Sequence, residues 1–254
     1  MGEGGPTRDS TWVELRQQRP RARLRLFCLP FAGGGAGVFR DWASELPDHV
    51  EVCAVRLPGR ERRFHEPAFD RVDPLVAAVL EGIAPLLDRP FALFGHSMGA
   101  LVAFELTRRL RALDLEPSAF FASACRAPHF PMREQMRHRL PEDRLVAELK
   151  SMNGTPPELL ENEELMRLVL PTLRSDFAVV ETFEFRPQPP FGCPLVVFGG
   201  KDDPEVSRDH LEGWSRYAGG GFRLHLMPGD HFFINSARAR LLEVLHSELT
   251  TVNL

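Results

Sequence analysis

Residues 95–99 read Gly-His-Ser-Met-Gly, which matches the Gly-x-Ser-x-Gly pattern that surrounds a nucleophilic serine. In that pattern the serine lies at a tight turn from a strand into a helix, and larger residues two places to either side would clash. The turn exposes the serine Oγ, and the following helix places the positive end of its dipole nearby. An apolar run precedes the motif, and a stretch rich in Ala, Leu and Val follows it. We therefore predict that Ser97 is a nucleophile.

A serine hydroxyl is a weak nucleophile, so this chemistry also needs a general base and an acidic group that orients the base. After such a serine, the acid and then the histidine follow along the chain. Two adjacent aspartates, Asp202 and Asp203, lie on the loop that follows the apolar run at 195–198, after Gly199-Gly200-Lys201. We favour Asp203 because an Asp-x-x-Val sequence after a strand is the usual setting of the acid. Asp202 remains the alternative.

The base is expected on a loop after the last apolar run, which spans residues 222–227. His231 follows that run and a Pro-Gly pair, whereas His225 alternates with apolar residues inside the run. Alternation of this kind is typical of one face of a strand. We predict that His231 is the base and that His225 is structural. His96, beside the nucleophile, is predicted to orient the turn.

A glycine-rich loop, defined here as residues 30–37, follows the first apolar run and reads Pro-Phe-Ala-Gly-Gly-Gly-Ala-Gly. Glycines let backbone N–H groups approach a developing oxyanion without an intruding side chain. We expect the N–H groups of Ala32 and Met98 to form this oxyanion hole. A phosphate-binding loop is the rival interpretation, but the Gly-Lys-Ser/Thr ending of such a loop is missing.

The elements that must position these groups alternate between short apolar runs and helix-like stretches. Strands are expected at 24–29, 50–56, 91–94, 119–124, 195–198 and 222–227, and helices between them at 38–46, 74–87, 98–113, 208–217 and 237–248. Apolar runs of this length are typical of strands buried on both faces of a sheet. The alternation predicts an α/β fold with a mostly parallel central sheet flanked by helices.

One segment, at about 128–190, contains no convincing strand. It shows helical patterns at 141–152 and 162–183, and the second has apolar residues at steps of three and four. We predict a helical lid insertion here, within a single domain that spans residues 23–254. Residues 1–22 are polar and are expected to form a loose N-terminal segment.

The composition is that of an ordinary globular protein, with 43% hydrophobic and 26% charged residues in a chain of 254. The net charge of −4 gives no reason to expect nucleic-acid binding. The chain shows no secretory signal pattern and no apolar run of membrane-spanning length, so a cytoplasmic location without membrane contact is expected. Its four cysteines form no Cys-x-x-Cys pair, and we expect free thiols and no metal site.

Four segments together resemble the type II thioesterases, the discrete α/β-hydrolases that accompany polyketide and nonribosomal peptide synthases. They are Leu29-Pro30-Phe31-Ala32-Gly33-Gly34, Arg56-Leu57-Pro58-Gly59-Arg60-Glu61, Phe94-Gly95-His96-Ser97-Met98-Gly99 and Pro228-Gly229-Asp230-His231-Phe232-Phe233. The second is the most discriminating, because general esterases and lipases lack it. The family often has glycine where this chain has Asp230.

The resemblance implies an α/β-hydrolase fold and a function in removing stalled or aberrant acyl units from synthases. The substrate would be an acyl thioester on the phosphopantetheine arm of an acyl or peptidyl carrier protein, and the enzyme would be a monomer without a cofactor. In this assignment Ser97, Asp203 and His231 are catalytic.

Carrier proteins are usually acidic, so a basic docking surface is expected near the entrance of the site. Candidate arginines are Arg56, Arg60, Arg62, Arg63, Arg133, Arg137 and Arg139, with ion-paired structural arginines as the alternative. A small-molecule carboxylesterase with the same triad is the nearest rival function. A catalytically inactive binding module is disfavoured because every triad position is filled.

Overall fold

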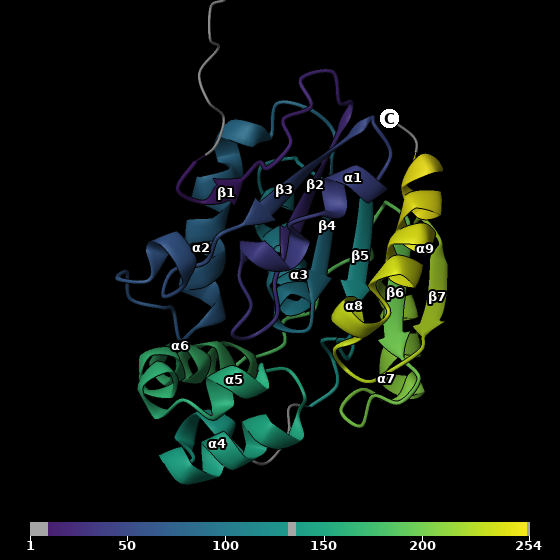
Figure 1. Ribbon diagram of the computed structural model, residues 1–254. Helices are drawn as coiled ribbons and strands as arrows, with labels where there is room; N and C mark the ends of the chain where they lie inside the picture. Colours follow the sequence, from purple (N-terminus) through teal and green to yellow (C-terminus); the bar gives the residue numbers. More distant parts are fainter. Residues whose placement is uncertain (1–9, 132–135, 253–254) are drawn as a thin grey trace, which may run out of the picture.

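The computed structural model describes residues 10–131 and 136–252 (Figure 1). Within them, seven strands form one sheet in the order β1-β3-β2-β4-β5-β6-β7. The strands are β1 (Val13–Glu14), β2 (Leu24–Leu29), β3 (Val50–Val55), β4 (Phe91–His96), β5 (Ala119–Ser123), β6 (Leu195–Gly200) and β7 (Phe222–Met227). All neighbouring pairs are parallel except β1 and β3, which are antiparallel. The predicted mostly parallel sheet is therefore confirmed.

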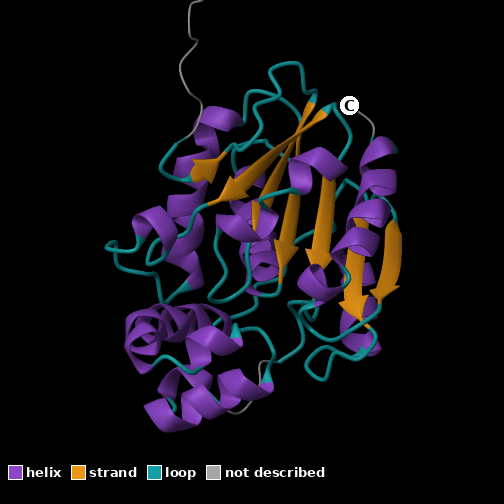
Figure 2. Ribbon diagram, viewed as in Figure 1, coloured by secondary structure: helices purple, strands orange, loops and turns teal. Residues whose placement is uncertain are grey.

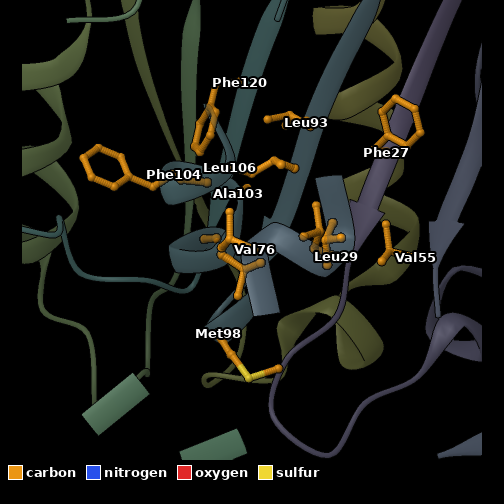
Figure 3. Packing of buried hydrophobic residues seen from close by; sticks show 14 of the residues in the cluster. Phe27, Leu29, Val55, Val76, Leu93, Met98, Ala103, Phe104, Leu106 and Phe120 are labelled. Atoms are coloured by element: carbon orange, nitrogen blue, oxygen red, sulfur yellow. The ribbon is translucent and has the colours of Figure 1, made fainter. Parts of the chain in front are cut away.

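The apolar runs of β2 to β6 form strands whose residues are all buried, because both of their faces are covered. In β2, Phe27 belongs to the core on one face of the sheet, and Leu26 belongs to the core on the other. Figure 3 shows the first of these cores, which contains Phe27 and Leu93 from two strands and Phe104 from a helix. Side chains that alternate between two buried faces leave no polar face for the solvent, which explains the near-continuous apolar sequence.

Helices cover both faces of this sheet (Figure 2). The core on one face includes residues of α2 (Val72–Ile83), α3 (Met98–Arg111) and α7 (Arg208–Glu212), and the core on the other includes residues of α1 (Trp42–Glu45), α8 (Phe233–Ser236) and α9 (Arg238–Thr250). Short 3₁₀ turns span Ala36–Phe39, Glu61–Arg63, Ala84–Leu86, Arg137–Arg139 and Gly213–Tyr217. The arrangement is the two-sided α/β architecture that the sequence predicts.

The helical insertion between β5 and β6 contains α4 (Glu142–Ser151), α5 (Pro157–Leu160) and α6 (Glu163–Glu181). These helices have a small core of their own, made of Leu145, Leu149, Met166, Leu170, Leu173 and Phe177. In Figure 1 they lie at the lower left of the view, beyond the edge of the sheet at which β4 and β5 end. The insertion thus adjoins the edge of the sheet where ligands bind in open parallel sheets. The short α5 was not predicted.

The expectation of a loose N-terminal segment is wrong for residues 10–22. Val13 and Leu15 are buried, and β1 pairs with β3 through Val13 and Val55. The ring of Trp12 lies against Gly82, where an added Cβ would be 2.2 Å from the indole. A two-residue strand is too short to show a period of two, so the sequence pattern could not reveal it. Residues 1–9 lie outside the described residues.

Candidate active site

Ser97 occupies the turn between β4 and α3. Its backbone has φ 53° and ψ −116°, a region that non-glycine residues rarely adopt and that costs about 1–3 kcal/mol. Two close approaches of backbone hold the turn in place: a Cβ on Gly95 would be 2.3 Å from the Gly99 carbonyl, and a Cβ on Gly99 would be 2.1 Å from the Leu29 carbonyl oxygen. The two glycines of the motif are therefore required by contact with backbone, which cannot move aside.

A chain of hydrogen bonds joins Ser97, His231 and Asp203. The His231 Nε2 lies 3.0 Å from the Ser97 Oγ, and the His231 Nδ1 lies 2.8 Å from the Asp203 Oδ2. The other carboxyl oxygen of Asp203 accepts the backbone N–H groups of Glu205 at 2.8 Å and Val206 at 3.2 Å. Because a carboxylate can only accept, Nδ1 carries the imidazole proton, and Nε2 is free to accept from the serine hydroxyl.

The structure thus brings together the three residues that the sequence nominates as nucleophile, acid and base. The alternatives lie elsewhere: Asp202 is exposed, and His225 bonds to Glu248 at 2.9 Å on the outer strand β7. Asp230, where the family often has glycine, accepts the backbone N–H of Phe232 at 2.8 Å and so shapes the histidine loop.

His96, the residue before Ser97, forms hydrogen bonds that stabilise the arrangement of the site. It is fully buried, and its Nδ1 lies 2.9 Å from the Ser123 Oγ while its Nε2 lies 2.9 Å from the His231 carbonyl oxygen. Burial, with the nearby His231 as a smaller cause, holds the pKa of His96 well below its usual 6.5. The neutral ring donates to the His231 carbonyl through Nε2–H and accepts the Ser123 hydroxyl at Nδ1. His96, the last residue of β4, therefore links this strand to the loop that carries the base.

The glycine-rich loop lies beside the nucleophile. Ala32, Met98, Ser97 and His231 all line one cavity. Within the described part of the chain, neither the Ala32 nor the Met98 backbone N–H donates a hydrogen bond to another protein group. Two unengaged donors next to a serine nucleophile are what an oxyanion hole requires.

This cavity encloses about 1050 Å³ of empty space, part of it open to solvent. Its apolar wall comes from α3 and the insertion, through Leu101, Leu149, Met152, Leu173, Phe177 and Val180. The wall also holds the thiol of Cys125, whose burial raises its pKa to about 12, so that it remains protonated and is not a rival nucleophile. The cavity suits an apolar chain attached to a group that reacts at Ser97.

Most arginines that were predicted to form a docking surface are instead buried and paired. Arg56 pairs with Glu14 at 3.2 Å, and Arg63 pairs with Glu66 at 2.5 Å while its guanidinium lies 3.8 Å above the Trp12 ring.

Arg60 bonds to Asp176 at 2.7 Å, and Arg137 bonds to Glu205 at 2.5 Å. All four of these arginines are less than one-tenth exposed, so the docking prediction is wrong for them. Arg62 and Arg139 are exposed, and Arg133 lies outside the described residues.

Sequence reasoning missed Asp176, whose buried carboxylate contacts the glycine-rich loop from α6. The available sign was a charged residue on the apolar face of a helix, directly before Phe177. A buried carboxylate there must have partners, because an unpaired charge is costly to bury.

Neither a metal centre nor a membrane span is found in the described ranges. No group of three or more His, Cys, Asp or Glu side chains in residues 10–131 and 136–252 is arranged to hold a metal ion. None of the helices in those same ranges combines the length and the apolar character that a membrane crossing needs.

Comparison with known proteins places these features in context. A family model described as "Thioesterase domain" matches residues 24–249. Linear gramicidin dehydrogenase LgrE of Brevibacillus parabrevis is 41% identical over 244 residues, covering 94% of this chain and 93% of that protein. Thioesterase PikA5 of Streptomyces venezuelae is 36% identical over 226 residues, covering 88% of this chain and 80% of that protein. Among solved structures, the type II thioesterase BorB from the borrelidin biosynthetic cluster superimposes with a TM-score of 0.88 at 35% identity, covering 96% of this chain and 99% of that one.

Proposed function

This chain belongs to the thioesterase domain family, and from that premise we propose that it hydrolyses acyl thioesters with Ser97 as its nucleophile. The observation that carries the proposal is the hydrogen-bonded series Ser97–His231–Asp203, which opens into an apolar cavity under the insertion. The series supplies an activated nucleophile, and the cavity supplies space for the acyl chain.

In the proposed mechanism the Ser97 Oγ attacks the thioester carbonyl while His231 Nε2 accepts the hydroxyl proton. The N–H groups of Ala32 and Met98 stabilise the tetrahedral oxyanion. When the C–S bond breaks, the imidazolium of His231 returns the proton to the leaving thiolate, and the acyl group remains on Ser97 as an ester. A water molecule, deprotonated by His231, then releases the carboxylic acid and restores the serine.

We propose that the leaving thiol is the phosphopantetheine arm of an acyl or peptidyl carrier protein. The similarity to PikA5 and to BorB, both named as thioesterases and the latter as part of a biosynthetic cluster, supports this partner. The function would be the removal of stalled or aberrant acyl units from a polyketide or nonribosomal peptide synthase, with the enzyme acting as a monomer. Arg62 and Arg139, which are exposed, remain candidates for contact with an acidic carrier protein.

The word dehydrogenase in the name of LgrE describes that protein, and no observation on this chain favours the same activity here. The glycine-rich loop follows a strand, as a dinucleotide-binding loop does, but its spacing does not match Gly-x-Gly-x-x-Gly. The loop instead lies beside Ser97, where hydrolysis needs its N–H groups.

The experiment that tests the proposal compares three substrates that share one acyl group and differ in the leaving group. Butyryl would be offered as a carrier-protein phosphopantetheine thioester, as a free pantetheine thioester and as a p-nitrophenyl oxygen ester. We expect kcat/KM to be highest for the carrier-bound thioester. Preference for the oxygen ester over both thioesters would contradict the proposal and favour the carboxylesterase alternative.

A further inference from the structure

A buried ion pair joins the insertion to the body of the protein close to the active site. Arg60 lies on the loop after β3, and Asp176 lies on α6; they are 8% and 2% exposed. The guanidinium binds the carboxylate through two nitrogens, with distances of 2.7 Å to Oδ2 and 2.8 Å to Oδ1. This fork geometry fixes the mutual orientation of two side chains that are 116 residues apart.

Both partners of this pair also hold the glycine-rich loop. The Asp176 Oδ2 accepts the backbone N–H of Gly33 at 2.7 Å, and Arg60 donates to the carbonyl oxygen of Gly34 at 3.0 Å. Gly33 has φ +79°, and a Cβ there would lie 2.5 Å from the Leu173 side chain of α6. The loop is thus pressed against α6 directly after Ala32, whose N–H is the proposed oxyanion donor.

The residue after Arg60 fixes the far end of the same loop. The Glu61 carboxylate accepts the N–H of Gly37 at 2.8 Å and of Ala36 at 3.1 Å. Glu61 itself has φ 49°, so the backbone is strained to direct the carboxylate there. Arg60 and Glu61 therefore restrain the middle and the C-terminal end of the glycine-rich loop.

We propose that Arg60 and Asp176 are positioning residues that hold the Ala32 N–H at the oxyanion through Gly33 and Gly34. The inference rests on the proposed function only in that the Ala32 N–H is taken as an oxyanion donor. The two residues do not touch the reacting atoms. They act by fixing the peptide unit between residues 32 and 33, which shares the Cα of Ala32 with the peptide unit that carries the Ala32 N–H. Displacement of a donor by even 1 Å weakens its bond to the transition state.

The contrast that isolates the Gly33 contact uses two double variants with the same change at Arg60. Asp176→Leu/Arg60→Met removes the ion pair and leaves the Gly33 N–H without an acceptor. Asp176→Asn/Arg60→Met also removes the ion pair, but its amide oxygen can still accept from Gly33. Neither variant buries an unpaired charge, so both are expected to fold, because replacing a whole buried pair is often nearly neutral.

Thr172→Val is the matched control for loss of an anchor on α6. Thr172 lies one turn before Asp176 and donates to the Gly59 carbonyl oxygen at 2.8 Å, so this hydrogen bond reaches the loop that carries Arg60 and not the glycine-rich loop. For every variant, kcat and KM on butyryl pantetheine, the Ki of a butyl trifluoromethyl ketone and the melting temperature would be measured. The ketone binds as a tetrahedral adduct, so its Ki reports on the oxyanion hole.

We expect kcat of the Asp176→Leu/Arg60→Met variant (the Leu/Met variant) to fall by about 10- to 100-fold relative to wild type, while its KM stays within about threefold. The Ki of the ketone should rise by the same factor as kcat falls. The Asn/Met variant should recover most of that loss, and Thr172→Val should resemble the wild type. Equal kcat and Ki for the two double variants would overturn the inference. Wild-type protein that cleaves only oxygen esters would overturn the proposed function, while the contrast between the double variants would still be read on p-nitrophenyl butyrate.

Discussion

Replacing Asp203 with asparagine should leave the fold intact and put the wrong histidine tautomer in the active site. The Asp203 Oδ1 accepts two backbone N–H groups, from Glu205 and Val206, and the Oδ2 faces the His231 Nδ1. An asparagine amide has one oxygen for these two positions. With its oxygen toward the backbone, its NH₂ donates to Nδ1, and the proton of the ring moves to Nε2. His231 then cannot accept a proton from Ser97.

The expected loss of kcat follows from the cost of the other amide orientation, in which the asparagine oxygen faces His231. With its oxygen toward His231, the NH₂ would face the two backbone N–H groups and leave both without an acceptor. Each buried unsatisfied donor costs about 1–3 kcal/mol, so the productive orientation is disfavoured by about 2–6 kcal/mol. At about 1.4 kcal/mol per factor of ten, kcat should fall by about 30-fold to more than 10⁴-fold.

The assay is steady-state hydrolysis of butyryl pantetheine, together with the melting temperature and ¹⁵N spectra of the His231 ring. Asp203→Asn should show protonated Nε2 and a melting temperature close to that of wild type. Asp202→Asn is the matched control, because Asp202 is the exposed neighbour of Asp203, and it should stay within about threefold of wild type. An active Asp203→Asn, or an inactive Asp202→Asn, would refute the assignment of the acid.

Three further predictions concern the turn that carries Ser97, the buried His96 and the cavity. Gly99→Ala places a Cβ 2.1 Å from the Leu29 carbonyl oxygen, so urea unfolding should show a loss of about 1–3 kcal/mol, with a fall in kcat; unchanged stability would contradict the packing argument. The His96 ring is neutral in the folded protein, but in the unfolded chain it takes up a proton below about pH 6.5. Its contribution to the free energy of unfolding is therefore complete above that pH and falls by about 1.4 kcal/mol per pH unit below it. In urea titrations at pH 7.5 and 5.5, His96→Gln should therefore lose less stability between the two pH values than wild type, and an equal loss would argue that His96 is not the cause. Leu149 lines the apolar wall of the cavity, so Leu149→Trp narrows the space for an acyl chain and should lower kcat/KM for octanoyl thioesters at least about tenfold more than for acetyl thioesters; equal effects would place the acyl chain elsewhere.

Local patterns in the sequence predicted the elements that position the site. The apolar runs marked β2 to β6 because these strands are buried on both faces, whereas the edge strand β7 is only partly buried. Gly95 and Gly99 marked the turn because backbone contacts exclude any larger residue. The order of Ser97, Asp203 and His231 follows from the chain visiting neighbouring strands in turn.

Contacts between distant segments could not be predicted in the same way. The pairing of Arg60 with Asp176 depends on how α6 lies across the sheet, and nothing local to either residue specifies it. An exposed docking role and a buried ion pair are equally consistent with arginine in sequence, which is why Arg56, Arg60, Arg63 and Arg137 were placed wrongly. The strand β1 is too short for any periodic pattern.

The proposed function requires that Ser97 carries out the hydrolysis of carrier-bound thioesters. The most direct test is the release of free thiol from a propionyl-loaded, phosphopantetheinylated carrier protein, with wild type beside Ser97→Ala and matched for folding by circular dichroism. We expect catalytic release by wild type and none above background by Ser97→Ala. Equal release by both proteins, or no release by wild type while it cleaves p-nitrophenyl esters, would contradict it.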